Sequence, residues 1–275
     1  MNIIDTHQHF WSYEPIKHQW IDDEMANIRS DFGPEELSLI YESLGVEGCI
    51  AVHADQTTAE TDYLLDLADR FDFIRGVVGW VDLKSGSLAQ DLEIWSDNEK
   101  LKGFRHVLQV EDPEFILDPT FLEGIKTVSS KGYLYEILIF PNHLPNSVEM
   151  VRRLPDTTFI LDHIAKPYIK NKDIAQWASH MRLLASHENV SCKISGMVTE
   201  ADYRQWKKSD FTPYLDVVLE AFGPERLMFG SDWPVCLVAA QYEDVLDIVT
   251  SYVGKLSEDE QEQILYTNAI NIYKL

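Results

Sequence analysis

Eight short apolar runs recur along the chain, and turn residues bound each of them. They are rich in Val, Ile, Leu and Phe, and nearly continuous apolar runs of this length are typical of strands buried on both faces of a parallel sheet. The pattern predicts strands over residues 3–10, 48–53, 74–81, 102–108, 133–139, 158–164, 190–195 and 226–232.

Amphipathic segments with helical spacing lie between these runs. Residues 34–45 begin with Pro34 and two glutamates and end at a glycine, which is the usual asymmetry of a helix. The same spacing predicts helices over residues 58–71, 121–132, 147–154, 174–188, 212–222 and 257–273. The last of these begins with a Ser-x-x-Glu capping box at Ser257.

The alternation of strand and helix predicts an α/β fold, a (β/α)₈ TIM barrel, which typically needs ~250 residues. An open doubly wound sheet is the alternative, but no G-x-G-x-x-G follows the first predicted strand. Because no linker, low-complexity tract or long charged run interrupts the sequence, we expect a single domain over residues 1–275.

Composition narrows the choice of partners. The chain has 46 Asp and Glu against 23 Lys and Arg, a net charge of −23, which argues against nucleic acid and against anionic membrane surfaces as partners. No apolar run approaches the ~18 residues of a membrane span, and the N-terminus shows no basic, cleavable leader, so a cytoplasmic protein is expected. Three cysteines without a C-x-x-C pair argue against disulfides and against a cysteine zinc site.

The histidines are concentrated at one end of the predicted strands. Five of the nine lie at or near a strand's C-terminal end, namely His7, His9, His53, His106 and His163, and His143 follows a further strand. In a parallel barrel these ends open on the face that holds the active site, so we expect the imidazoles to converge there. A purely structural role is the alternative, above all for His53 and His143.

Two sequence features suggest the chemistry of that face. His7 and His9 alternate along the first strand and therefore point to the same side, where they can grip one divalent ion or a substrate oxygen. Asp232 ends the eighth strand and is a natural general base for water, unless it only caps the following turn. Asp162 and His163 are expected to face opposite ways, with His163 in the mouth and Asp162 orienting a neighbouring loop.

Four segments carry a resemblance to the amidohydrolase superfamily of (β/α)₈ hydrolases and, within it, to the branch of sugar-acid and pyrone-dicarboxylate lactonases. They are residues 5–11 (DTHQHFW), 103–106 (GFRH), 161–167 (LDHIAKP) and 229–234 (FGSDWP). They span almost the whole chain in the expected order. The resemblance implies hydrolysis of the lactone ring of a sugar acid by an activated water.

The sequence departs from the two-metal members of this superfamily. Those place a Lys or Glu on the fourth strand and a His on the fifth, whereas this chain offers Arg105 and His106 on the fourth and Glu136 on the fifth. A two-metal site is therefore not expected. The resemblance leaves a ligand set of His7, His9 and Asp232, with His163 or Glu136 as additions, which could hold one Zn²⁺ or Mn²⁺ or no metal at all.

In this reading Asp232 takes a proton from the attacking water, and His163 is the second catalytic residue. The predicted substrate contacts are Arg105, His106, His53, Trp11, Trp80 and Glu136. Arg105 suits paired oxygen contacts, with a salt bridge closing the barrel as its alternative role. Trp11, Trp80 and Trp233 would stack on the sugar, with packing of loops as the alternative.

Other functions stay open at this stage. A metal-dependent decarboxylase of the same superfamily is the first, although such enzymes use a fifth-strand histidine that is missing here. A different carboxylic-ester or amide hydrolase and a binding protein without catalysis are the others. A homodimer is compatible with the sequence but not selected by it. We expect specificity to be set by the loops over residues 12–30 and 199–212.

Overall fold

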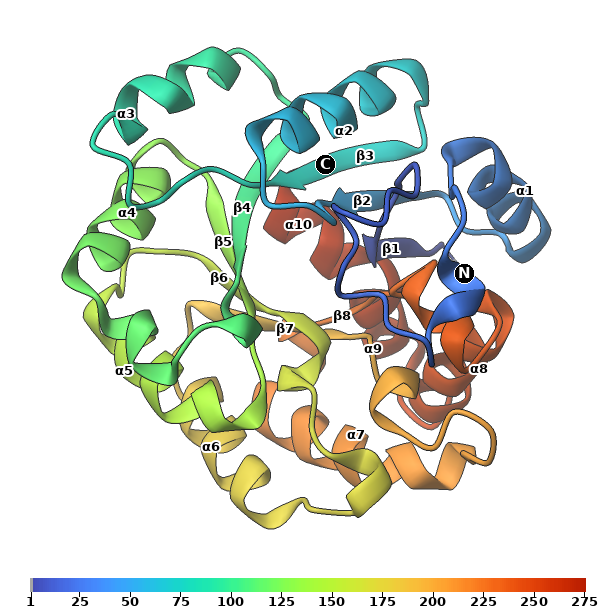
Figure 1. Ribbon diagram of the computed structural model, residues 1–275. Coiled ribbons are helices and arrows are strands. Elements are labelled where there is room, and N and C mark those ends of the chain that lie inside the picture. The colour runs from blue at the N-terminus through green and yellow to red at the C-terminus, as the bar shows by residue number, and fades with distance from the viewer. Residues whose placement is uncertain (1) are drawn as a thin grey trace.

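Eight parallel strands follow one another around a barrel in the computed structural model, which describes residues 2–275 (Figure 1). The strands are β1 (Ile4–Gln8), β2 (Gly48–Val52), β3 (Ile74–Gly79), β4 (Leu101–Val107), β5 (Leu134–Leu138), β6 (Phe159–Leu161), β7 (Val190–Ile194) and β8 (Leu227–Phe229). Their order in the sheet is their order in the chain. The predicted TIM barrel is confirmed, and every predicted strand is present. Most are somewhat shorter than predicted, β6 and β8 are much shorter, and β4 begins and ends one residue earlier than predicted.

A helix follows every strand and covers the outside of the barrel (Figure 1). These helices are α1 (Pro34–Leu44), α2 (Thr58–Arg70), α3 (Leu88–Asp91), α4 (Pro119–Ser130), α5 (Leu144–Arg153), α6 (Ala175–Ala185), α7 (Lys208–Phe222) and α8 (Tyr242–Val253). Two of these helices, α8 and the single turn α3, were not predicted from the sequence. The predicted helix over 257–273 is present as a continuous helical segment, in which a π-helical turn at Gln263–Thr267 lies between α9 (Glu258–Glu262) and α10 (Asn268–Tyr273).

The barrel closes where β8 meets β1. The backbone N–H of His9 donates to the carbonyl oxygen of Trp233 at 2.7 Å, and the N–H of Asp232 donates to the carbonyl of His7 at 2.8 Å. The hydroxyl of Thr6 adds a bond to the carbonyl of Phe229 at 2.7 Å. These bonds place the last strand's C-terminal residues directly beside the His-x-His segment of the first.

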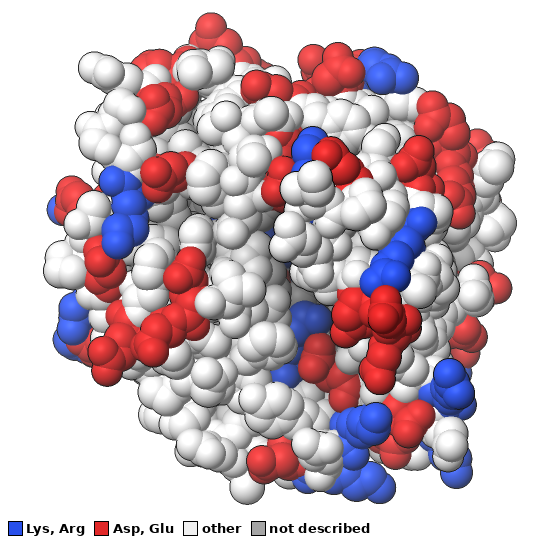
Figure 2. Space-filling model, in the orientation of Figure 1, with Lys and Arg blue, Asp and Glu red and all other residues white. Residues whose placement is uncertain are grey.

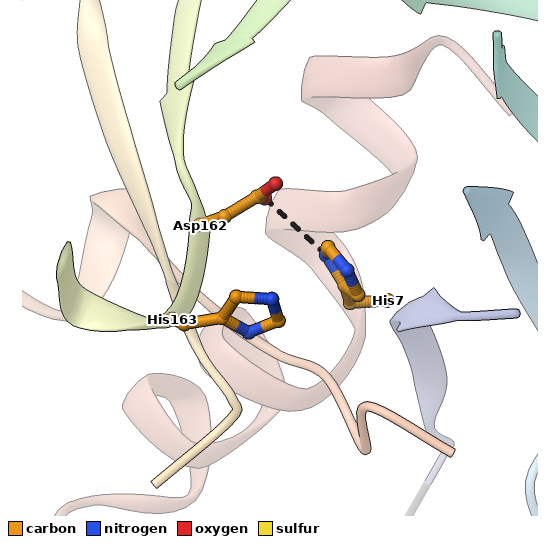
Figure 3. A group of neighbouring side chains, drawn as sticks. All are labelled: His7, Asp162 and His163. Atoms are coloured by element: carbon orange, nitrogen blue, oxygen red, sulfur yellow. Dashed lines mark ion pairs between the residues drawn. The ribbon is translucent and has the colours of Figure 1, made fainter. Parts of the chain in front are cut away.

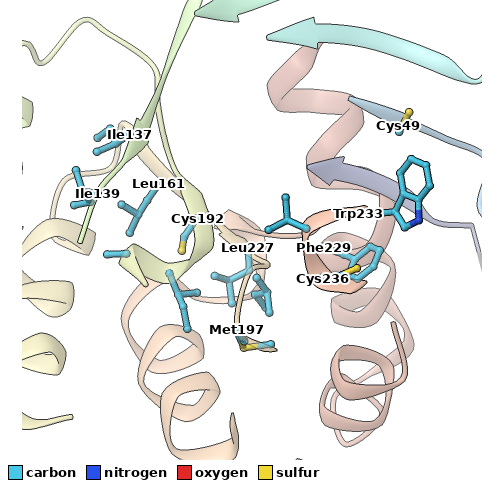
Figure 4. Close-up of a cluster of buried hydrophobic side chains, with 14 of the residues drawn as sticks. Cys49, Ile137, Ile139, Leu161, Cys192, Met197, Leu227, Phe229, Trp233 and Cys236 are labelled. Carbon is cyan, nitrogen blue, oxygen red and sulfur yellow. The ribbon is translucent and has the colours of Figure 1, made fainter. Parts of the chain in front are cut away.

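Alternation along the strands divides the buried side chains into two apolar layers. An inner cluster fills the barrel at its N-terminal end and includes Ile4, Ile50, Ile160 and Met228, with Tyr273 of α10 packed among them. A larger cluster lies between the strands and the surrounding helices, and Figure 4 shows the part of it around Leu161, Cys192 and Phe229. All three cysteines are free and buried. Within residues 2–275, no helix is both long enough and apolar enough to cross a membrane.

Candidate active site

A layer of charged side chains crosses the barrel above the inner apolar cluster. Arg105, Glu136 and Lys193 point inward from β4, β5 and β7, and Asp162 follows β6; all four are buried. Asp162 accepts from Arg105 Nη1 through Oδ2 at 3.1 Å and lies 3.1 Å from Lys193 Nζ through Oδ1. Lys193 Nζ also donates to Glu136 Oε2 at 2.6 Å. Two cations and two carboxylates thus balance each other in a region closed to water.

His7 and His9 lie next to this layer, at the end of the barrel formed by the strands' C-terminal ends, which we call the mouth. Their rings are 5.0 Å apart, in agreement with the predicted shared side. His7 Nδ1 lies 3.3 Å from Asp162 Oδ1, while Nε2 lies 3.2 Å from Arg105 Nη1. His9 Nδ1 donates to the carbonyl oxygen of Val52 at 2.7 Å, and its Nε2 lies 3.5 Å from Asp232 Oδ1.

The chain after β6 brings Asp162 and His163 to the same side, which corrects the expectation that they face opposite ways. Four successive residues, 163–166, adopt positive φ angles of 54°, 48°, 59° and 45°. This left-handed turn of non-glycine residues costs about 1–2 kcal/mol per residue, and it ends the alternation of the strand. Both side chains then extend toward His7 (Figure 3), and the rings of His7 and His163 are 4.2 Å apart.

Asp232 faces the imidazoles from the other side of the mouth. Its Oδ1 lies 3.5 Å from His9 Nε2 and 3.9 Å from His163 Nε2. Its Oδ2 is buried and finds no hydrogen-bond partner among residues 2–275. Burial opposes the charge of this carboxylate, but His163 and His9 outweigh it, so the pKa of Asp232 is lowered. The structure therefore presents an ionised carboxylate with a free oxygen at the mouth.

Burial disfavours the charged form of three of the imidazoles. Burial lowers the pKa of His7, His53 and His163 well below the usual value, and neighbouring cations add to this effect. Asp162 stays ionised beside them, since Lys193, His7 and Arg105 outweigh its burial and hold its pKa well below the ordinary value. Neutral rings beside carboxylates are suited to bind a metal or to move a proton.

Arg105 forms a buried salt bridge with Asp162, which is the role that was the alternative to substrate binding. Its Nη2 donates to the carbonyl oxygen of His53 at 2.6 Å, its Nε lies 3.4 Å from His53 Nε2, and its Nη1 bonds Asp162. The prediction that Arg105 grips sugar oxygens does not fit this arrangement, because all three nitrogens have partners inside the protein. His53 is fully buried, with its Nε2 3.0 Å from the carbonyl oxygen of Arg105.

Several other predicted substrate contacts lie away from the imidazoles. His106 pairs with Glu111 at 3.1 Å, and His143 bonds the carbonyl oxygen of the same residue, so these two histidines do not join the convergent group. The two carboxylate oxygens of Glu136 are bonded to Lys193 and Tyr273 below the mouth, which leaves neither for a metal or a sugar.

The tryptophans mostly pack among loops. Trp233 is fully buried against Phe10 and Phe32, which excludes sugar stacking for this ring. Trp11 is also buried, although its ring centroid is 6.4 Å from that of His9. Trp80 is half-buried, and its backbone N–H is bonded to the hydroxyl of Thr61. The stacking roles of Trp11 and Trp80 stay predictions.

Sequence analysis gave no role to Lys193, Asp5 or Lys166. Lys193 stands in the middle of an apolar strand run, and a lysine at an inward strand position was the signal that could have revealed it. Asp5 accepts four hydrogen bonds at the seam between β8 and β1. Burial opposes the charge of Lys166, but Glu200 and Asp232 outweigh it and raise the pKa of this lysine, which places a firm positive charge near Asp232.

The residues present fit a single metal ion. The donor atoms of His7, His9 and Asp232 lie within 4.8 Å of one another. The donor atoms of a second group, His7, Asp162 and His163, lie within the same distance of one another. Two imidazoles and a carboxylate with one unpartnered buried oxygen form a donor set that zinc prefers. Asp162 stands behind His7 as the carboxylate partner that orients many metal-binding histidines.

The position of His163 depends on the absence of a side chain at Gly196. A Cβ at Gly196 would lie 2.6 Å from His163 Cγ and Nδ1, and φ at this glycine is +60°. We expect Gly196→Ala to displace the ring and to lower kcat. Gly45→Ala is the matched control, since Gly45 has a φ of +70° with nothing within 4 Å. Both should lose about 1 kcal/mol or more of stability in urea unfolding, but only Gly196→Ala should lose turnover. Equal kcat in the two variants would contradict the assignment.

The comparisons with known proteins agree with this fold. The amidohydrolase family model matches residues 4–275, and the chain belongs to this family. It is 37% identical to L-fucono-1,5-lactonase of Burkholderia multivorans, over 99% of this chain and 96% of that protein. The L-rhamnono-gamma-lactonase of Scheffersomyces stipitis is 27% identical, over 66% of this chain and 61% of that protein. A crystal structure of a Burkholderia multivorans amidohydrolase with bound zinc superimposes with a TM-score of 0.96 at 38% identity, over 100% of both chains.

Proposed function

We propose that this protein hydrolyses the lactone ring of a sugar acid, with an aldono-1,5-lactone of the L-fucono type as the substrate class. The single observation that carries the proposal is the free Oδ2 of ionised Asp232, buried beside His9 and His163 at the mouth. The similarity to L-fucono-1,5-lactonase over nearly the whole of both chains supports the choice of a lactone.

Asp232 would remove a proton from water as the water attacks the carbonyl carbon, and would return that proton to the ring oxygen when the ester bond breaks. We assign the hydroxyl of Ser195 as donor to His163 Nδ1, at 2.9 Å, which leaves Nε2–H of His163 directed into the mouth. That N–H can stabilise the oxyanion that forms on the carbonyl oxygen. A lactone suits this modest set of groups, because its ester carbonyl is more reactive than an amide.

A metal, where present, would be held by His7, His9 and Asp232. When bound there, a zinc ion supplies Lewis-acid polarisation of the substrate carbonyl. The zinc in the similar Burkholderia multivorans structure supports this choice of metal. Val52 fixes the ring of His9 and Asp162 fixes that of His7, so the protein prepares both imidazoles without rearrangement.

The face that contains the mouth combines a largely uncharged centre with a charged cavity between two of its loops. In Figure 2 acidic residues lie mainly around the rim, whereas uncharged residues surround much of the central hollow. On the mouth side, a cavity of about 770 Å³ lies between the loops after β1 and β7. A second cavity, of about 380 Å³, lies beside α10 and away from the mouth. Most of the residues that line the larger cavity come from the two loops expected to set specificity, and they include charged side chains such as Asp23, Glu200 and Arg204. The cavity lies beside the convergent histidines and Asp232, none of which lines it.

The test is a pH-indicator assay of acid release over a panel of lactones. The panel contains the 1,5- and 1,4-lactones of L-fuconic, L-rhamnonic, D-galactonic and D-arabinonic acids and a pyrone dicarboxylate. We expect the L-fucono lactone to be among the best substrates. Release of CO₂ from an aromatic acid, without acid release from any lactone, would favour the decarboxylase instead. That outcome is not expected, because β5 carries Glu136 and no histidine.

Zinc binding is tested separately from turnover. After equilibration with zinc and removal of the excess, elemental analysis should find one zinc per chain. His9→Ala should weaken zinc binding by more than ~100-fold, because replacing even a partner of a metal ligand costs 10–100-fold. His106→Ala is the control, since His106 pairs with Glu111 and lies outside both donor groups. Normal zinc content in His9→Ala would refute the assigned ligand set.

A further inference from the structure

Trp80 carries a buried hydrogen-bond donor that the chain itself does not pair. Its indole Nε1 finds no hydrogen-bond partner among residues 2–275. A buried indole N–H usually has a partner, as in Trp95, whose Nε1 donates to Asp62 Oδ1 at 2.7 Å. The Nε1 of Trp233 is unpaired as well, but that ring is fully buried, whereas the ring of Trp80 is partly exposed. An indole N–H can only donate, so Trp80 calls for an acceptor from outside the chain.

Alternation along β3 directs the side chain of Trp80 toward the barrel axis. Val78 belongs to the inner cluster. Gly79 faces α2, because a Cβ there would lie 2.5 Å from the side chain of Thr61. Val81 belongs to the larger cluster between the strands and the helices. Trp80 lies between these two outward positions, so its indole is on the axis side, two residues beyond Val78 and at the mouth.

Thr61 of α2 holds the backbone of Trp80 from outside the barrel. The hydroxyl of Thr61 accepts from the N–H of Trp80 at 2.8 Å and donates to the carbonyl oxygen of the same residue at 2.9 Å. Thr61 is fully buried, and the missing side chain at Gly79 lets it approach this closely. The indole is therefore presented to the mouth by a fixed backbone before any ligand binds.

The place of Trp80 in the barrel decides which part of a lactone it meets. The strands follow chain order and close at the seam of β8 and β1, so β6 is three strands from β3 in one direction and β8 is three strands away in the other (Figure 1). In the proposed reaction the carbonyl carbon lies beside Asp232 and His163, which follow β8 and β6. The oxygens that extend toward β3 are then ring hydroxyls, and a hydroxyl oxygen can accept from an indole N–H.

We propose that Trp80 is a specificity-determining residue whose indole N–H donates to a ring hydroxyl of the lactone, on the side away from the carbonyl. The inference rests on the proposed lactone hydrolysis and adds to it a means of recognising the sugar. It assigns the polar edge of the ring to the substrate, where sequence analysis predicts stacking by its face. A lactone without that hydroxyl is disfavoured because the buried donor then stays unpaired.

The first experiment removes the donor and keeps the shape of the ring. Replacing Trp80 with benzothienylalanine puts a sulfur in the place of the indole N–H. On the best lactone of the panel we expect kcat/KM to fall roughly 3–10-fold, through a higher KM at unchanged kcat, which is the usual effect of one neutral hydrogen bond to the substrate. The comparison is repeated with lactones from which one ring hydroxyl at a time has been removed. On the lactone that lacks the partner hydroxyl, the variant and the unmodified protein should have equal kcat/KM.

Trp95 supplies the matched control. Its Nε1 is bonded to Asp62, and its ring packs in the larger cluster on the outside of the barrel. The same replacement there should leave KM unchanged for every lactone. A loss at Trp80 that is equal for every lactone would assign its ring to packing alone, and no loss on any lactone would leave its N–H without a role in binding. Either result would overturn the proposal.

The second experiment tests the anchor of the ring. Thr61→Val removes the hydroxyl that binds both backbone groups of Trp80, whereas Thr61→Ser keeps it. We expect Thr61→Val to raise KM several-fold and Thr61→Ser to restore the KM of the unmodified protein. Combined with benzothienylalanine in place of Trp80, Thr61→Val should cost no further kcat/KM, because the donor that it positions is already absent. Additive losses would remove Thr61 from the arrangement.

The indole N–H can also be observed without turnover. The lactam of the same sugar acid keeps the ring hydroxyls and resists hydrolysis. In a ¹H–¹⁵N spectrum, the indole signal of Trp80, assigned by its absence in Trp80→Phe, should move downfield when the lactam binds. If no lactone is hydrolysed but the lactam moves this signal, only the proposed function fails. If lactones are hydrolysed and saturating lactam leaves the signal in place, only the role of Trp80 fails.

Discussion

We expect Asp232→Asn to lower kcat for the lactone by at least ~100-fold, the range in which loss of a general base usually falls. Asparagine keeps the shape of the side chain but cannot accept a proton from water. The backbone N–H of residue 232 still donates to the carbonyl of His7, so the seam of the barrel is preserved. The measurement is steady-state kinetics, with thermal unfolding to show that the variant is folded.

Asp112→Asn provides the control for this substitution. Asp112 also follows a strand on the mouth side, but it is exposed and only caps a short turn through the N–H of Glu114. Its replacement should leave kcat and KM unchanged. Near-normal turnover by Asp232→Asn, at the same pH and with the same lactone, would remove Asp232 from the mechanism and leave the imidazoles to activate water.

The barrel could be predicted from sequence because its physical signals are local. Each strand is a nearly continuous apolar run, and in the helices between them the apolar residues recur at helical spacing. Alternation also places residues correctly where strands are regular: Cys192 and Ile194 face the helices, while Lys193 faces the axis. The end-of-strand positions of His7, His9 and Asp232 follow from the same rule.

The failures lie where the backbone leaves the regular strand or where partners are distant in sequence. Asp162 and His163 were placed on opposite sides because the left-handed turn that begins at His163, and brings its ring to the side of Asp162, is not visible in the pattern of apolar residues. Arg105 was predicted to bind the substrate because its actual partner, Asp162, is 57 residues away in the chain and the sequence pattern does not link the two. The π-helical turn inside the predicted helix over 257–273 was not foreseen, because such a turn has no distinct composition.

Asp5→Ala should lower the free energy of unfolding by about 3–5 kcal/mol, because several buried donors lose their acceptor at about 1–3 kcal/mol each. Oδ1 of Asp5 accepts from the backbone N–H groups of Ser231 and His7, at 2.8 and 3.1 Å. Oδ2 accepts from the hydroxyls of Tyr41 on α1 and Tyr242 on α8, at 3.0 and 3.1 Å. One carboxylate therefore joins β1, β8 and two helices, and urea unfolding measures its contribution.

Asp69→Ala is the control for this loss, since Asp69 is exposed on α2 and its removal should change stability by no more than about 0.5 kcal/mol. A second substitution tests the cause. Tyr41→Phe should destabilise the unmodified protein, whose carboxylate loses a donor, but should cost nothing further in Asp5→Ala, where the tyrosine hydroxyl has already lost its acceptor. Additive losses in the double variant, or a loss below about 1 kcal/mol for Asp5→Ala, would show that the seam is held by packing rather than by this carboxylate.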